Sequence, residues 1–127
     1  MEKCRLTIIT TADGQENRVF LDGEIEAKTQ VIKVQYADNG AQVTLSVKNE
    51  EVFIEREGDY SLNLHLKKDS VCKGSIGIAG SKGEVETKAH EISYSLKEDS
   101  FLLSLQYDLL IGNETQAMKI RLLGKKI

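Results

Sequence analysis

Turn signals recur about every ten to twelve residues along this chain, and the alternation of apolar and polar residues keeps its phase across the turns. In a hairpin with a two-residue loop, residues at equal distances from the loop pair and point to the same face. Apolar residues then meet apolar residues, and a slip of one residue would turn each set outward. This regularity predicts consecutive antiparallel hairpins.

The first of these two-residue loops is centred on Asp13-Gly14, a dipeptide suited to the positive backbone angles of a type I′ turn. The others are centred on Thr29-Gln30, Asn39-Gly40, Asn49-Glu50, Ser81-Lys82, Glu98-Asp99 and Gly112-Asn113. The expected pairs are Ile8 with Val19, Leu6 with Leu21, Ala27 with Ile32, Ile25 with Val34, Tyr36 with Val43, Val34 with Leu45, Val47 with Val52, Leu45 with Ile54, Ile78 with Val85, Leu96 with Phe101, Tyr94 with Leu103, Tyr107 with Met118, and Leu105 with Ile120.

Two places break this rhythm. The in-phase pairing of Ile54 with Leu62 needs an odd-numbered loop, and Gly58 is placed to supply its left-handed residue. Further along, the residues expected to point inward have odd numbers up to Ala89 and even numbers from Ile92 onward. This change requires one extra residue in the strand. We therefore expect a β-bulge at His90-Glu91.

The pattern contains no sustained helical period, and the chain has no proline to interrupt a ladder. Because the number of strands is even, the last can lie antiparallel to the first and close the sheet, which removes exposed edges. We expect one β-barrel domain over residues 1–127, an all-β up-and-down barrel, with a two-sheet sandwich of the same strands as the second arrangement. The ten expected strands are 3–11, 16–28, 31–37, 41–48, 51–57, 60–67, 73–80, 83–97, 100–110 and 114–123.

Composition narrows the class of protein. The net charge is −3 and charges of both signs are interleaved, which argues against a nucleic-acid binder. No apolar run approaches the ~20 residues of a membrane helix. With no leader before the first strand, and two cysteines that suit a reducing compartment, we expect a cytoplasmic protein.

Several sequence runs resemble a known family. They are Val52-Phe53-Ile54-Glu55-Arg56-Glu57-Gly58, Gly74-Ser75-Ile76-Gly77-Ile78, Thr87 followed by Ile92 and Tyr94, and Leu105-Gln106-Tyr107-Asp108-Leu109. Through them the chain resembles the YwiB-like family, a bacterial domain of unknown function with a lipocalin-like, or calycin-like, barrel. The likeness extends over nearly the whole chain and implies that fold, but it implies no activity, ligand or catalytic residue.

Strand direction places four inward polar residues near the loops at one end of the barrel: Tyr36, Arg56, Thr87 and Tyr107. A guanidinium in the barrel mouth can anchor a carboxylate or phosphate, and hydroxyls can complete such a site. In the structural interpretation, which is the commoner role, Arg56 donates to loop carbonyls and stacks on a tyrosine. We expect the other end to be closed by apolar residues: Ala27, Ile32, Val47, Val52, Leu66, Leu96 and Phe101, with Tyr94 just above them.

The sequence does not indicate catalysis. His65 shares the outward parity of its polar neighbours, and His90 beside Glu91 is expected to be an ordinary exposed pair. Cys4 and Cys72 have neither a nearby histidine nor metal-ligand spacing. We therefore expect no enzymatic activity, no catalytic residue, no cofactor and no metal site.

Two functional hypotheses follow. In the first, the barrel binds a small anionic or amphipathic ligand at the mouth around Arg56. In the second, it is a protein-interaction or regulatory module that acts through its outer surface, and its interior is only a packed core. The outward residues Ile9, Leu102, Leu110 and Leu123 lie on strands that a closed barrel makes neighbours, which favours a homodimer or partner surface there. Neither hypothesis involves nucleic acid or a membrane.

Overall fold

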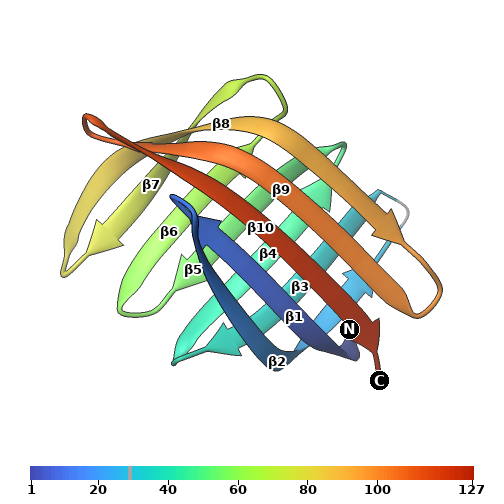
Figure 1. Cartoon of the computed structure of the whole chain (residues 1–127). Coiled ribbons are helices and arrows are strands. Elements are labelled where there is room, and N and C mark those ends of the chain that lie inside the picture. Colours follow the sequence, from blue (N-terminus) through green and yellow to red (C-terminus); the bar gives the residue numbers. More distant parts are fainter. Residues whose placement is uncertain (29) are drawn as a thin grey trace.

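The computed structural model describes residues 1–28 and 30–127, and the regular elements in these ranges are strands. They follow one another around a closed barrel in which β10 pairs with β1, so the predicted all-β antiparallel meander is confirmed (Figure 1). None of the described residues forms a helix long and apolar enough to cross a membrane. The strands are β1 (Glu2–Ala12), β2 (Gln15–Ala27), β3 (Val31–Asp38), β4 (Ala41–Lys48), β5 (Glu51–Glu57), β6 (Tyr60–Leu66), β7 (Val71–Ile78), β8 (Ser81–Leu96), β9 (Ser100–Ile111) and β10 (Glu114–Lys126).

Turn chemistry fixes the register of most hairpins. Asp13-Gly14 and Asn39-Gly40 both adopt positive φ at their two central residues, as type I′ turns require. The pairs predicted around these turns, and those at the β4–β5, β8–β9 and β9–β10 hairpins, are confirmed. The predicted turn at Thr29-Gln30 includes Thr29, which lies outside the described residues, but both flanking pairs are present.

The β5–β6 hairpin corrects one prediction. Ile54 lies opposite Leu64 instead of Leu62. Gly58 does not supply a left-handed residue, since the described glycines with positive φ are Gly14, Gly40, Gly80 and Gly112. A Cβ on Gly58 would lie 2.7 Å from the Cβ of Ala41, so this glycine permits a close approach between strands.

The β7–β8 hairpin corrects a second prediction. Its turn is Ala79-Gly80, with φ of 51° and 83°, in place of Ser81-Lys82. Val85 consequently lies opposite Gly74 and not opposite Ile78. Gly80 adopts the left-handed backbone without steric cost, which favours the earlier turn. The turn moves by an even number of residues, so the residues of both strands that were predicted to point inward still do so.

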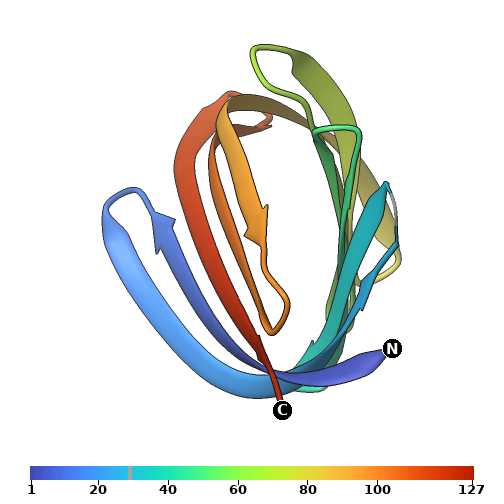
Figure 2. The ribbon, with the colours of Figure 1, turned by 90° about the vertical axis from the view of Figure 1, so that its right-hand side faces the viewer.

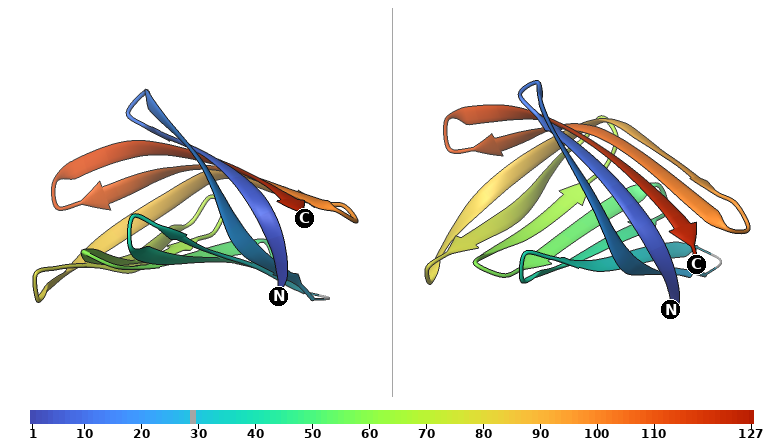
Figure 3. Two further views of the ribbon diagram at one scale, coloured as in Figure 1. Left: turned by 90° about the horizontal axis from the view of Figure 1, so that it is seen from below. Right: turned by 60° about the horizontal axis from the view of Figure 1, so that its bottom comes forward.

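The predicted bulge in β8 is confirmed. Ala89 pairs with Tyr107 and Glu91 pairs with Gln106, which leaves His90 as the extra residue. Bulges bend the strand that carries them. Figure 3 shows β9 and β10 in one layer and β3 to β7 in the other, while β8 and the β1–β2 hairpin run from one layer to the other.

The interior is a packed apolar core. Leu6, Leu66, Leu103, Leu105 and Leu122 are among its largest enclosed side chains, and each contributes ~1.5–3 kcal/mol of burial energy. At the end predicted to be an apolar plug, five residues are buried: Ile32, Val47, Val52, Leu66 and Phe101. The prediction is wrong for Tyr94 and Leu96, which are each 43% exposed, and for Ala27, which is also exposed.

The barrel closes along ladders that are shorter than its strands. β2 pairs with β3 only from Gly23 to Ala27, so Gln15–Asp22 pairs with β1 alone. β8 pairs with β7 only up to Lys88, and apart from the bridge between Ala89 and Lys68 its later residues pair with β9 alone. Figure 2 shows both the β1–β2 hairpin and the end of β8 standing away from the opposite layer. This incomplete closure explains why Tyr94 and Leu96 remain exposed.

Candidate functional site

Arg56 lies on β5 opposite Val43 and Leu62, at the predicted mouth. Its Nη1 donates to the carbonyl oxygen of Tyr60 at 2.7 Å, and its Nη2 donates to Oδ1 of Asp59 at 2.9 Å. The guanidinium carbon lies 3.7 Å from the centroid of the Tyr60 ring. These are the contacts that the structural interpretation predicts. The hydrogen bond from Arg56 lowers the pKa of Asp59, which keeps that carboxylate charged.

Tyr36 and Tyr107 face inward near Arg56. Burial raises the pKa of both hydroxyls to about 12, so both are neutral at physiological pH. Asp38 adds to the rise at Tyr36 and the charge of Arg56 opposes it, whereas Tyr36 adds to the rise at Tyr107. Tyr36 is therefore within electrostatic reach of both other residues, and the structure brings these three predicted site residues to the same end of the barrel.

Thr87, the fourth predicted site residue, has a different role. Its side chain is buried, and Oγ1 donates to the carbonyl oxygen of His65 at 2.5 Å. The β6–β7 ladder ends at Asn63, so β6 and β8 meet directly beyond it, and Lys68 forms a bridge with Ala89 there. Thr87 closes this seam, and its hydroxyl donates to β6, whereas Arg56 binds Asp59 and the Tyr60 carbonyl.

The two histidines each pair with a carboxylate on the outer surface. His65 Nε2 lies 2.7 Å from Oε1 of Glu51, and its ring stacks on Phe53 with centroids 4.5 Å apart. His90 Nε2 lies 2.8 Å from Oδ2 of Asp108, a partner that the sequence does not indicate. Among residues 1–28 and 30–127 there is no group of three or more side chains placed to hold a metal ion.

Both cysteines are buried free thiols. Burial is the largest of the effects that raise the pKa of the Cys4 thiol, and the nearby carboxylates of Asp22 and Glu24 act in the same direction. A raised pKa keeps Cys4 in its unreactive protonated form. The cysteines therefore act as small core residues.

A groove on the outer face was not predicted. It has a volume of about 540 Å³ and crosses β1, β10, β9 and β8. One row of outward residues forms its floor, in which Leu123 lies opposite both Thr7 and Leu102. In the next row Arg5 lies opposite Lys125. Lys97 is the third cation in the lining.

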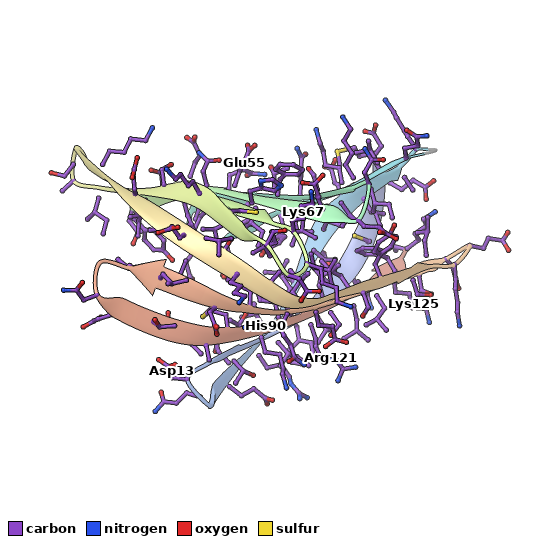
Figure 4. The ribbon with its side chains drawn as sticks, turned by 90° about the horizontal axis from the view of Figure 1, so that it is seen from above. Asp13, Glu55, Lys67, His90, Arg121 and Lys125 are labelled. Atoms are coloured by element: carbon purple, nitrogen blue, oxygen red, sulfur yellow. The ribbon has the colours of Figure 1, made fainter. Side chains whose placement is uncertain are left out.

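The groove was missed because its rows cross the β1–β10 closure, which no local hairpin signal determines. Outward parity alone identifies Leu102 and Leu123 as exposed apolar residues. The register then shows that the other two outward residues do not join them, because Ile9 lies opposite Arg121 and Leu110 opposite Thr115. Figure 4 labels Lys125 near the end of β10 and Arg121 further back on the same strand.

The fold places the protein among small closed antiparallel β-barrels with a packed interior. The chain belongs to the family defined as a domain of unknown function, DUF1934, which matches residues 4–122. The crystal structure of the ywiB protein from Bacillus subtilis has a TM-score of 0.84 to this structure, covers 99% of this chain and 92% of that chain, and is 16% identical in sequence. The resemblance to the YwiB-like family is confirmed, and at this identity it shows the fold alone. No curated protein matches the chain.

Proposed function

We propose that this protein is a non-catalytic cytoplasmic binding module whose ligand, a small amphipathic anion, lies in the groove on its outer face. The proposal combines the anionic chemistry of the first hypothesis with the outer surface of the second. A groove of about 540 Å³ falls within the range of small-molecule sites. We call it the outer groove, and define it by Arg5, Lys97, Leu102, Leu123 and Lys125.

The observation that carries the proposal is the pair formed by Arg5 and Lys125. These two cations lie directly opposite each other on neighbouring strands. Like charges in that position destabilise a sheet. Within residues 1–28 and 30–127, no carboxylate forms an ion pair with either one. Arg5 lies opposite the carboxylate of Asp22 on its other side, whereas Lys125 lies between Arg5 and Ser100. A bound anion would therefore supply the negative charge that Lys125 lacks opposite it.

The floor of the outer groove supports an apolar group on the same ligand. Leu102 is 36% exposed and Leu123 is 40% exposed, and they face each other across β9 and β10. An alkyl chain over this pair would remove apolar surface from water, at about 25 cal/mol per Å². Lys125 lies two residues after Leu123 on β10, with Arg5 beside it on β1. A head group at Lys125 and a tail at Leu123 would therefore lie along β10.

The mouth around Arg56 is the second candidate, and it stays a prediction. One observation favours it: the inward tyrosines Tyr36 and Tyr107 lie at the same end of the barrel as Arg56, and their hydroxyls are neutral. Against it, Arg56 already binds Asp59 and the Tyr60 carbonyl. A test of the outer groove therefore has to include Arg56.

Decanoate is a suitable probe, because it combines a carboxylate with an apolar tail. We expect decanoate to bind in isothermal titration calorimetry, and nonyltrimethylammonium, which has the same alkyl tail and the opposite charge, not to bind. Lys125→Glu should weaken decanoate binding by at least about tenfold, since a charge-assisted contact is lost and repulsion added. The same variant should raise the free energy of unfolding by about 0.5 kcal/mol, because a carboxylate then replaces the like charge opposite Arg5, which already has Asp22 on its other side.

Two further variants locate the site. Lys48→Glu makes the same charge change on an exposed residue of β4, outside the outer groove, and should bind decanoate like the unmodified protein. Arg56→Ala should also bind normally. Loss of binding in Arg56→Ala with retention in Lys125→Glu would move the ligand to the mouth. No heat of binding for decanoate at any concentration below micelle formation would contradict the outer-groove proposal.

A further inference from the structure

The end of β8 forms an open sheet edge. Residues 91–96 pair with β9 on one side, from Glu91 opposite Gln106 to Leu96 opposite Phe101. On the other side, β7 pairs only up to Lys88 and a single bridge joins Ala89 to Lys68. Among the described residues, no strand pairs with this edge beyond the bridge. Its backbone donors and acceptors on that side are available to another strand.

This edge lacks the features that usually prevent edge-to-edge pairing. Residues 92–96 contain no charge and no proline, and Tyr94 and Leu96 are each 43% exposed. The open edge of β2 differs, because charged residues, Glu16, Arg18 and Asp22, flank the exposed Phe20 on its outer face. Natural edges that remain free are normally protected by charged side chains. The uncharged edge of β8 is therefore the one adapted to pairing.

We propose that this edge pairs antiparallel with the same edge of a second copy of the chain, which makes the protein a symmetric homodimer with a sheet continuous across the two copies. With Tyr94 on the two-fold axis, Ile92 lies opposite Leu96 of the second copy, so apolar residues meet. In the same register Glu91 lies opposite Lys97 of the second copy, which places opposite charges at both ends of the paired segment.

Residues 91–97 are complementary to themselves in the antiparallel direction, which favours a second copy of the chain over an unrelated strand as the partner of this edge. One register satisfies the apolar pairs, the serine pair formed by Ser93 and Ser95, and both end charges at once. The paired segment is short, so the interface lies at the small end of specific interfaces and the dimer should depend on concentration. The dimer edge shares Lys97 with the outer groove. The inference does not depend on ligand binding there, since Tyr94, on the two-fold axis, lies outside the groove.

Sedimentation equilibrium over a range of protein concentrations tests the dimer. We expect a mass of two chains at high concentration and dissociation on dilution. Tyr94→Lys places two lysines together at the axis and should raise the dissociation constant by at least about tenfold. Phe20→Lys, the matched change at a 71% exposed residue on the open edge of β2, should leave the dissociation constant unchanged.

A charge exchange keeps the test independent of folding defects. Glu91→Lys and Lys97→Glu should each weaken the dimer, because each single change puts like charges opposite each other. The double variant should restore it. A wild-type protein that stays monomeric up to about 0.5 mM would overturn the proposal, as would a dimer disrupted by Phe20→Lys but not by Tyr94→Lys.

Discussion

At the scale of single residues, polar groups inside this barrel serve its closure. The buried Thr87 hydroxyl donates to a backbone carbonyl on β6, a strand to which β8 is joined by no ladder. Arg56 similarly holds the β5–β6 loop through Asp59 and the Tyr60 carbonyl. Parity correctly predicted that both side chains point inward, but parity does not reveal their partners. Both therefore resembled ligand-binding residues until their contacts were known.

Thr87→Val removes the hydroxyl and keeps the shape of the side chain. It leaves the carbonyl of His65 without its side-chain donor in a buried place, so we expect the free energy of unfolding to fall by about 1–2 kcal/mol. Thr115→Val, at an exposed position on β10, is the matched control and should have little effect. Urea denaturation of the three proteins measures the difference. Equal stabilities would show that Thr87 does not close the seam.

At the scale of elements, glycines mark the places where strands come close or change partner. β2 pairs with β3 from Gly23 to Ala27, and the part of β2 that precedes Gly23 in the chain pairs only with β1. A Cβ on Gly23 would lie 2.7 Å from the carbonyl oxygen of Gln35, closer than such atoms approach. The sequence shows this glycine inside an otherwise regular strand pattern. Only the structure shows that β3 leaves β2 at this residue.

Gly23→Ala should therefore lower the free energy of unfolding by about 1–3 kcal/mol, the usual effect of overpacking. Gly83→Ala is the matched control on β8, where the nearest atom to a new Cβ would be 3.8 Å away. That change should leave stability the same or raise it slightly, because alanine restricts the unfolded chain. Thermal denaturation compares the two variants. A Gly23→Ala protein as stable as the wild type would contradict the close approach of β2 and β3.

At the scale of the whole molecule, the packed interior determines how stability depends on pH. Tyr36 and Tyr107 have a pKa of about 12 in the folded protein, because burial disfavours the phenolate, against ~10 in an unfolded chain. Below pH ~10 both forms of the chain hold these protons. Between pH ~10 and ~12 the unfolded chain loses them first, so alkali favours unfolding.

We expect the free energy of unfolding to fall by about 2 kcal/mol per tyrosine as the pH rises from ~10 to ~12. Urea denaturation at a series of pH values measures this fall, and absorbance near 295 nm follows the phenolates. The double variant Tyr36→Phe with Tyr107→Phe should lose most of the dependence, since lysines and the other tyrosines remain as the background. A double variant with the same alkaline loss would show that the two hydroxyls are not buried.

The sequence by itself determined the ten strands, the face on which each residue lies, the bulge at His90 and the meander order. These features are local, because turn residues and alternating side chains act over a few neighbouring positions. The hairpins at Gly58 and Gly80 moved by an even number of residues, since parity is strongly encoded and exact loop length is not. Only the tertiary structure decided the β1–β10 register that places Arg5 opposite Lys125, and the early end of the β7–β8 ladder that exposes the edge of β8. Both depend on where distant strands meet as the sheet bends and closes, and no short stretch of sequence specifies that.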